Sequence, residues 1–417
     1  MLINRDEYIR LALNFRDTDL VKVVTGVRRC GKSCLFSLVQ KKIENENVKN
    51  RGFITINLEE KGLKITSSND LYNYIKSNLS NKGKTYLFID EIQRTEGWHD
   101  VINSIRVEFN VDIYLTGSNA FLLSSELSTY LSGRYVEIKM LPLSFSEYCN
   151  FLGLKFKKDS TIATNSNARP VIFDDCFKTF LKFGGMPALA RDNINQEMHK
   201  QYFSALYEAV IQRDIIGHER HASQHRISDQ ELLRMLCEYL ADTVGNLSAV
   251  TKIANTLTSA GRKISHVTVS SYIKALVDAY IVYPCKRFDV HGKELLKTTP
   301  KNYLVDLGLI SYLNNYRSQN VGFTFENAVY LQLMFKGWSV HVGKLYDKEI
   351  DFIALKDGEV MYVQVAEEMF MQSTRDRELS PLKSIKDNHK KIVVVRQGEY
   401  EHDVDGIEIL KPKDFFL

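Results

Sequence analysis

The sequence predicts an α/β protein with an N-terminal parallel sheet, a mainly helical middle and a second, smaller α/β unit. Three observations predict this fold class. Apolar, β-branched runs alternate with helix-patterned segments over residues 20–140, helical patterns dominate residues 171–280, and short strand-like runs return after residue 335. Alternating strands and helices are typical of a parallel sheet covered by helices.

Length and composition limit the possible classes of protein. The 417 residues exceed one compact core and suggest two to four domains of roughly 100–200 residues each. Hydrophobic residues make up 44% and charged residues 25% of the chain, values of a globular protein. We find neither an apolar run of about 18 residues nor a signal-peptide pattern, so we expect no membrane association. The six cysteines have no zinc-site spacing, which favours free thiols in a reducing cytoplasm.

Four apolar runs predict the strands of the first sheet. They are LVKVVT at 20–25, GFITINL at 52–58, TYLFID at 85–90 and VDIYLTG at 111–117. Residues 153–170 are polar and rich in helix breakers, so we expect an irregular loop there.

A glycine-rich segment follows the first predicted strand directly. Residues 26–33 have the sequence GVRRCGKS, which matches GxxxxGK[ST], and a helix-patterned segment follows. Glycines let backbone N–H groups point at phosphate oxygens, and the helix N-terminus adds positive potential. We therefore predict a P-loop in which Lys32 reaches the β- and γ-phosphates and Ser33 binds Mg²⁺. The residues predicted to contact the nucleotide in this segment are Gly26, Val27, Arg28, Arg29, Cys30, Gly31, Lys32, Ser33 and Cys34. For Cys30 and Cys34, packing and a redox switch are both open interpretations.

The third predicted strand ends in two acids, Asp90 and Glu91. A buried parallel strand delivers these residues to its carboxyl edge, where ligands bind in open α/β sheets. We predict that Asp90 holds Mg²⁺ through water and that Glu91 polarises the attacking water. The fourth strand ends in Thr116-Gly117-Ser118-Asn119. A polar residue there either contacts the γ-phosphate or the water, or caps an ordinary strand-to-turn transition.

These motifs together resemble a known family. TGVRRCGKS, FIDEIQ, YLTGSNA and LSGRYVEIKMLPLSFSEY are similar to segments of prokaryotic AAA+-type ATPases that join this core to a C-terminal domain of unknown function. The resemblance implies ATP as the nucleotide, a sensor role for Ser118 or Asn119, and a γ-phosphate contact for Arg134, within one chain or across an interface. FGGMP at 183–187 resembles the Gly-x-Pro motif of related ATPases, which implies that Pro187 contacts the base. Arg213 is a further candidate phosphate contact.

Residues 247–305 have the order of a winged helix-turn-helix: two amphipathic segments at 247–259 and 266–279, then a strand-rich stretch that resembles a wing. Between 250 and 301, nine Lys or Arg face three Asp or Glu, a local charge of +6. This favours phosphate contacts with DNA, although such modules also dock proteins. The candidate contacts are Arg262, Lys263, Lys274, Lys286, Arg287 and Lys293.

The C-terminal pattern resembles the core of PD-(D/E)xK nucleases. That chemistry needs two acidic metal ligands on adjacent strands and a lysine two residues after the second. Glu326 lies in a helical stretch and Asp351 fits the first acid, but Gln364 replaces the second and Ala366 stands where the lysine belongs. We expect no cleavage, with migration of Lys344 or Lys348 into the lysine's role as the alternative.

The sequence thus predicts an ATPase core at 1–140, a helical lid at 141–228, a winged helix at 229–305, and an inactive nuclease-like (restriction-endonuclease-like) α/β domain at 317–417. The main hypothesis is a slow Mg²⁺-dependent ATPase switch that acts on DNA or a protein partner. The first rival is a DNA-binding regulator in which ATP is structural, and the second is an active nuclease.

Overall fold

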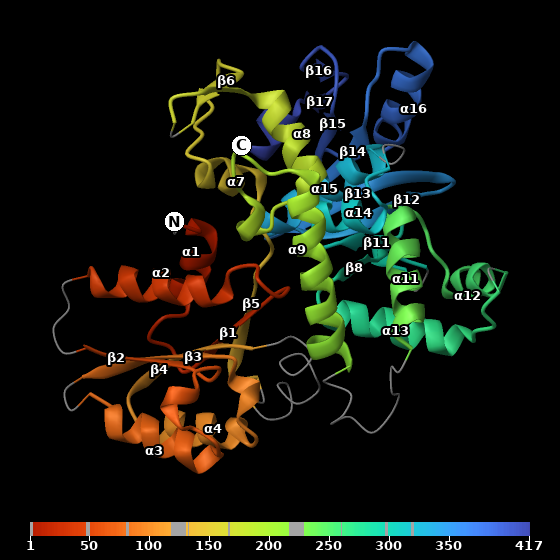
Figure 1. The fold of residues 1–417 in the computed structure, drawn as a ribbon. Helices are drawn as coiled ribbons and strands as arrows, with labels where there is room; N and C mark the ends of the chain where they lie inside the picture. Colours follow the sequence, from red (N-terminus) through yellow and green to blue (C-terminus); the bar gives the residue numbers. More distant parts are fainter. Residues whose placement is uncertain are drawn as a thin grey trace. The chain divides into compact units, whose positions relative to one another are not determined.

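A computed structural model of the chain describes residues 3–46, 51–80, 83–117, 131, 133–165, 167–216, 229–259, 261–296, 299–317 and 321–417. The chain forms two compact units (Figure 1). Unit 1 holds residues 1–142, 208–226 and 278–280, and unit 2 holds residues 143–207, 227–277 and 281–417.

Unit 1 is built on a five-stranded parallel sheet in the order β2-β3-β4-β1-β5, which confirms the predicted α/β class. Its strands are β1 (Val21–Thr25), β2 (Arg51–Asn57), β3 (Lys84–Asp90), β4 (Val111–Thr116) and β5 (Tyr135–Lys139). All five residues of β1 are buried, which explains its nearly continuous apolar sequence. Buried Lys22 is the exception, and its ammonium binds the buried carboxylate of Asp112 on β4.

Helices cover both faces of this sheet (Figure 1). The helical segments are α1 (Asp6–Asn14), α2 (Lys32–Glu44), η1 (Lys61–Leu63), α3 (Ser68–Asn78), η2 (Ile92–Arg94), α4 (Trp98–Glu108) and η4 (Val210–Ile216). One face packs against α3 and α4 through Leu71, Ile75, Ile102 and Ile105, all fully buried. Helix α3 begins in a capping box in which Ser67 and Asp70 bond each other's backbone N–H groups.

Unit 2 contains most of the remaining helices and two kinds of sheet. The helical segments are α7 (Phe145–Phe151), α8 (Phe173–Phe183), η3 (Pro187–Leu189), α9 (Gln196–Ala209), α11 (Gln230–Asp242), α12 (Val250–Ser259), α13 (His266–Asp278), α14 (Leu307–Leu313), α15 (Val321–Phe335), α16 (Gln372–Lys383) and α17 (Pro412–Phe416). The aromatic stripe of α8 packs on α7, since Phe145 contacts Phe173, Phe177 and Phe180 edge to face.

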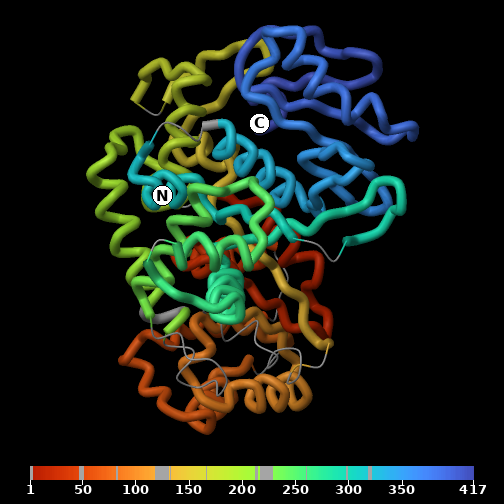
Figure 2. Tube along the Cα trace, turned by 90° about the vertical axis from the view of Figure 1, so that its right-hand side faces the viewer, coloured from red at the N-terminus to blue at the C-terminus, as the bar shows by residue number. Residues whose placement is uncertain are grey.

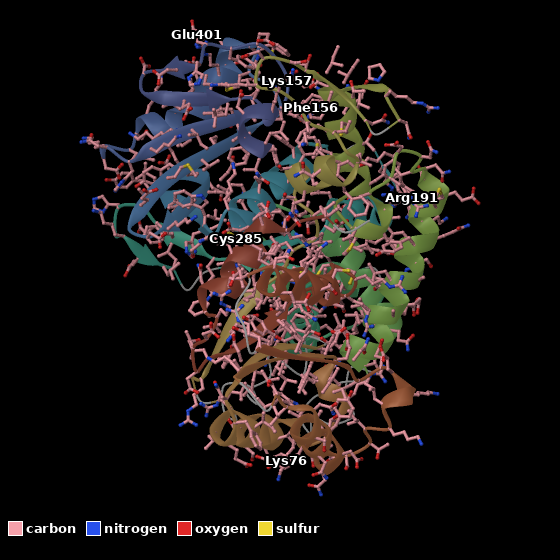
Figure 3. All side chains as sticks on the ribbon, turned by 90° about the vertical axis from the view of Figure 1, so that its left-hand side faces the viewer. Lys76, Phe156, Lys157, Arg191, Cys285 and Glu401 are labelled. Atoms are coloured by element: carbon pink, nitrogen blue, oxygen red, sulfur yellow. The ribbon has the colours of Figure 1, made fainter. Side chains whose placement is uncertain are left out.

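The strands after residue 335 belong to an eight-stranded mixed sheet in the order β10-β9-β12-β13-β14-β15-β17-β16. Its members are β9 (Arg287–Asp289), β10 (Glu294–Leu295), β12 (Ser339–Leu345), β13 (Lys348–Lys356), β14 (Glu359–Ala366), β15 (Lys390–Val395), β16 (Asp403–Val404) and β17 (Ile407–Leu410). Figure 2 shows residues 335–417, in blue, gathered in one part of this unit. Glu401 is exposed at the surface of unit 2, whereas Cys285 is buried (Figure 3).

Two segments differ from the sequence-based expectations. The stretch 153–170, expected to be irregular, contributes to a small hairpin of β6 (Ile162–Thr164) and β7 (Pro170–Ile172). In the expected wing, β8 (Val282–Cys285) pairs with β11 (Lys301–Leu304), but β9 and β10 between them extend the eight-stranded sheet. Sequence patterns indicate strands but not the partners of each strand.

Candidate functional site

The glycine-rich loop connects β1 directly to α2. Gly26 has φ 142° and Gly31 has φ 108°, backbone conformations that favour glycine. A Cβ on Gly26 would lie 2.1 Å from the main-chain oxygen of Met140, so only glycine fits there. Arg29 also has a positive φ, 66°. Within this segment the side chains of Val27 and Cys30 are buried, whereas those of Arg29, Ser33 and Cys34 are exposed.

Lys32 lies over the loop that it terminates. Its ammonium donates to the main-chain oxygens of Gly26 (2.9 Å) and Val27 (3.2 Å). Lys32 and Ser33 are the first two residues of α2, so the positive end of the helix dipole adds to the charge of the ammonium. A cation and a helix N-terminus at one loop are the features that phosphate groups require.

Asp90 and Glu91 lie at the same edge of the sheet as the loop. All five strands are parallel, and in register Ile89 pairs with Leu115, which pairs with Val23 of β1. Their carboxyl ends therefore share one edge. Asp90 is buried, and the hydroxyl of Thr116, at the end of β4, donates to its carboxylate. The same hydroxyl accepts the N–H of Glu91 at 3.3 Å, so Thr116 positions both acids.

Glu91 has an unusual backbone conformation, with φ 57° and ψ 45°. A non-glycine residue in this left-handed region costs about 1–2 kcal/mol. Such strain is concentrated at functional sites. The side-chain amide of Gln93 donates to the Glu91 carboxylate, which fixes its orientation. The sequence analysis named Thr116 only as part of the segment that ends β4, and it did not name Gln93 as a partner of Glu91; a polar residue two positions after Glu91 was the available signal.

A further residue that the sequence analysis did not name is Arg5, which binds the main chain of the loop. Its buried guanidinium donates to the main-chain oxygens of Cys30 (3.2 Å), Leu141 (3.0 Å) and Pro142 (3.1 Å). This ties the loop to the segment after β5. No local pattern marks Arg5, since its partners are 25 to 137 positions away.

Arg134 lies at the amino ends of the parallel strands, whereas the glycine-rich loop lies at their carboxyl ends. It directly precedes β5, and its main-chain oxygen accepts from the N–H of Val21, the first residue of β1. The glycine-rich loop follows the last residue of β1. The five residues of this strand, at about 3.3 Å each, separate the loop from the start of β1 by about 16 Å. Arg134 is exposed. Ser118 and Asn119 lie outside the described residues, as does the side chain of Arg213.

Pro187 belongs to unit 2, where it begins η3 and is half-buried. The glycines before it have a packing reason of their own. A Cβ on Gly184 would lie 2.2 Å from the Asp306 carboxylate, and the N–H of Gly185 donates to that carboxylate at 2.7 Å. Burial raises the pKa of Asp306 to about 6.

The basic residues of the helical middle are not equivalent. Arg262 already binds the carboxylates of Asp229 and Glu231, and Arg287 is half-buried in β9. Lys263, Lys274, Lys286 and Lys293 are exposed. Of the six candidate contacts, these four lysines therefore present exposed ammonium groups to a polyanion.

A buried carboxylate centre lies in unit 2, and Lys301 of β11 forms its cation. The Lys301 ammonium lies 3.1 Å from Glu326 of α15, 2.9 Å from Glu349 and 4.0 Å from Asp351 of β13. Tyr303 donates to Glu326 at 2.6 Å, and Asp351 accepts the N–H of Val365 at 2.8 Å. Gln364 connects the centre to Glu378 at 3.1 Å. Burial opposes the charged form of Lys301, but Glu326, Asp351 and Glu349 together raise its pKa above its usual range.

The expected alternatives for the missing lysine lie elsewhere. Lys348 donates to Ser380 (2.8 Å) and Ser384 (2.7 Å), and Lys344 lies on β12. Burial, and next the charge of Glu326, raise the pKa of Asp351 well above its usual range. Among the described residues, no group of His, Cys, Asp and Glu is arranged to hold a metal ion. Lys301 supplies a cation within this group of carboxylates.

Comparisons with known proteins fit this geometry. A family model described as an AAA domain matches residues 18–149, and one described as a domain of unknown function (DUF8612) matches residues 174–320. The chain is 36% identical to an uncharacterised protein of Haemophilus influenzae over 418 residues, covering 100% of this chain and 99% of that one. It is 30% identical to an uncharacterised protein of Methanocaldococcus jannaschii over 395 residues, covering 93% and 82%.

Solved structures are more distant. The Walker-type ATPase PABY2304 of Pyrococcus abyssi aligns with 74% of this chain and 95% of its own, at 14% identity and a TM-score of 0.47. None of the helices in the described ranges is long and apolar enough to span a bilayer.

Proposed function

The chain belongs to the family that includes the Haemophilus and Methanocaldococcus relatives and has an AAA-type P-loop domain at its N-terminus, and on that premise we propose that it is a slow, Mg²⁺-dependent ATPase that acts as a nucleotide switch. Binding of ATP orders the loop region, and hydrolysis releases it.

The observation that supports this proposal is the meeting of the loop 26–33, Asp90, Thr116 and Glu91 at one edge of the parallel sheet. The loop amides and Lys32 bind the phosphates. The oxygens of Ser33 and Asp90 are the hard donors that Mg²⁺ prefers, and the bound ion would neutralise charge on the phosphates. Glu91, held by Gln93, orients the attacking water.

Arg134 has a different role in this proposal. Because it lies at the edge opposite its own loop, it would contact the γ-phosphate bound by a second copy of the chain rather than its own. Ser118 or Asn119 as the sensor, and Pro187 as the base contact, complete the proposed site. We also propose four domains, at residues 1–140, 141–228, 229–305 and 317–417. The six free cysteines favour a cytoplasmic location.

The test is phosphate release from ATP with Mg²⁺ by the wild type and Glu91→Gln. We expect Glu91→Gln to bind ATP normally and to lose about 100-fold or more in turnover, since positioned general bases contribute about 10²–10⁴-fold. Glu96→Gln is the matched control, because Glu96 is an exposed acid in the same segment. Equal turnover in wild type and Glu91→Gln would refute the assignment, and Lys32→Ala should abolish binding itself.

Four exposed lysines favour a second candidate, a DNA-binding regulator in which ATP is structural. All four are exposed: Lys263 precedes α13, Lys274 lies on α13, and Lys286 and Lys293 lie in the segment after it. DNA binding that weakens steeply with salt, persists in Glu91→Gln and ignores nucleotide would support this candidate. DNA-stimulated ATP turnover would instead link the two activities.

For the carboxylate centre of unit 2 we propose a structural role without nuclease activity. Lys301 binds the carboxylates that a catalytic metal would require. The test is a DNA-nicking assay with Mg²⁺ or Mn²⁺. Robust nicking by the wild type that is lost in Asp351→Ala would overturn this proposal.

A further inference from the structure

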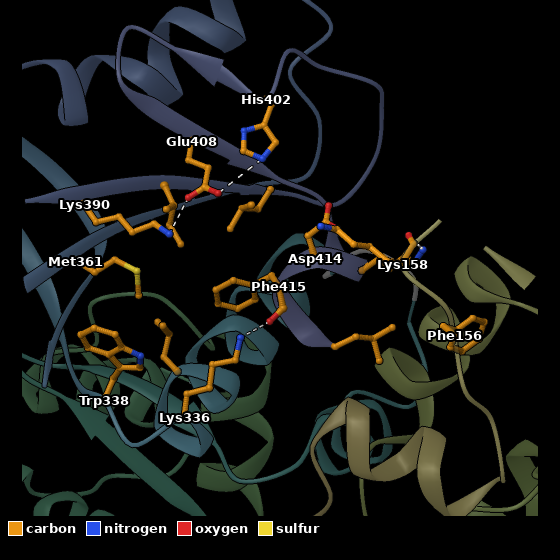
Figure 4. Close-up of a pocket in the computed structure, with 15 residues that line it drawn as sticks. Phe156, Lys158, Lys336, Trp338, Met361, Lys390, His402, Glu408, Asp414 and Phe415 are labelled. Atoms are coloured by element: carbon orange, nitrogen blue, oxygen red, sulfur yellow. Dashed lines mark hydrogen bonds and ion pairs between the residues drawn. The ribbon is translucent and has the colours of Figure 1, made fainter. Parts of the chain in front are cut away.

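A cavity of about 690 Å³ lies over one face of the eight-stranded sheet (Figure 4), and none of the residues of the carboxylate centre lines it. Its walls come from β14, β15 and β17, from the end of α15, from α17, and from the segment at 156–158. The volume is in the range of small-molecule sites, which is about 300–1,000 Å³. None of these residues belongs to the P-loop domain.

Four lysines line the cavity: Lys158, Lys336, Lys390 and Lys413. Two side-chain acids, Glu408 and Asp414, oppose them, so the lining side chains have an excess of two positive charges with His402 neutral. Glu408 is shared, since it lies 2.8 Å from Lys390 and 3.7 Å from His402 (Figure 4).

Two of these lysines are bonded to neutral groups. Lys336 donates to the main-chain oxygen of Phe415 at 2.6 Å, and Lys413 donates to the main-chain oxygen of Lys158 at 2.5 Å. No ion pair joins either ammonium to a carboxylate of the described residues. Burial, and next the charge of Lys390, lower the pKa of Lys336. An anion in the cavity would relieve this repulsion and supply the missing counter-charge.

The rest of the lining is apolar. Trp338 and Phe415 contribute rings, and Leu333, Met361 and Ile392 contribute aliphatic or thioether surface. Figure 4 shows Trp338, Met361 and Lys336 bordering the same hollow. Flat apolar groups stack on such rings, and aromatic–base stacking is worth about 1–3 kcal/mol per base.

We propose that this cavity binds a nucleoside phosphate, whose phosphate group contacts Lys336 and Lys413 and whose base stacks on Trp338. The site is separate from the P-loop and goes beyond the proposed ATPase activity. The same chemistry occurs in a free mononucleotide and in the phosphorylated end of a single-stranded nucleic acid.

The test uses the full chain with Trp98→Phe and Lys32→Ala. The chain has two tryptophans, so Trp338 becomes the only indole reporter, and Lys32→Ala removes phosphate binding at the P-loop. AMP, CMP, adenosine, inorganic phosphate and a 5′-phosphorylated oligothymidylate are titrated while tryptophan fluorescence is recorded. We expect saturable quenching by the mononucleotides, and binding of adenosine or phosphate alone at least about tenfold weaker.

Lysine variants then locate the site. Lys336→Met and Lys413→Met should each weaken binding about tenfold or more, because each removes a charge-assisted contact. Lys383→Met is the matched control, since Lys383 pairs with Asp405 at 2.7 Å and does not line the cavity. Lys413 is a second test in case Lys336→Met impairs folding, which circular dichroism reports.

Each outcome decides the proposal. Tighter binding of the oligonucleotide than of the mononucleotides assigns the site to a nucleic-acid end, and the reverse assigns it to a free nucleotide. Quenching that never saturates, or that is unchanged in both lysine variants, overturns the proposal. Inorganic phosphate that binds as tightly as AMP overturns the role of the ring.

Discussion

Replacement of Lys301 by methionine removes the cation of the carboxylate centre while it keeps a side chain of similar length. Lys301 has a side-chain exposure of 5%, and its partners Glu326 and Asp351 have exposures of 12% and 15%. Both carboxylates would then be buried without a counter-charge. We expect the variant to fold less stably, with the loss concentrated in β11, β13 and α15.

The magnitude follows from burial. Removal of one partner from a buried ion pair typically costs about 3–5 kcal/mol. Glu349 adds little, because its exposure of 36% places it among solvent-screened pairs worth about 0–1 kcal/mol. We therefore expect a loss of about 3 kcal/mol near neutral pH, a large share of the roughly 5–15 kcal/mol that stabilise a domain.

The loss should depend on pH. The pKa of Asp351 is already raised in the folded chain, and removal of the ammonium raises it further. A carboxyl whose folded pKa exceeds its unfolded pKa destabilises the fold as pH rises through that interval. The difference between wild type and Lys301→Met should therefore be smaller at pH 5.5 than at pH 8.

Hydrogen–deuterium exchange of the β13 and β14 amides is the assay, because it reports local stability in a chain of two units. Asp351→Asn in the Lys301→Met background should restore part of the protection, whereas Lys383→Met should change nothing. Protection in Lys301→Met within about 1 kcal/mol of wild type at both pH values would refute the reasoning, since a buried pair should cost more.

Further predictions concern both units. Gly26→Ala should abolish ATP binding and destabilise unit 1 by about 1–3 kcal/mol through overpacking against Met140; Gly62→Ala, which meets no atom within 4 Å, is the control in calorimetry and thermal unfolding. Burial lowers the pKa of His199 to about 4, so the stability that it contributes is present above its unfolded pKa of about 6.5 and is lost as pH falls toward 4. The difference in denaturation midpoint between wild type and His199→Gln should shrink over that window, and a constant difference would contradict a neutral buried imidazole.

The P-loop strand, loop and helix are contiguous in the sequence, and this is why the sequence alone located them. A buried strand, a glycine pair at fixed spacing and an amphipathic helix each leave a local pattern. Asp90 and Glu91 were located in the same way, at the end of an apolar run. What the sequence could not show was the support of this site by Thr116, Gln93 and Arg5, because hydrogen bonds between distant segments leave no periodic signal.

Tertiary structure also determines two placements that the sequence did not indicate. The parallel register of β1 and β5 places Arg134 at the edge opposite the P-loop, which no motif around the arginine could indicate. The cation of the carboxylate centre is Lys301, 50 residues before Asp351 and on β11, a strand of a different sheet from β13. Local sequence determines which strands and helices form, whereas the pairing of distant strands decides which charges meet, because that pairing depends on burial of the whole chain.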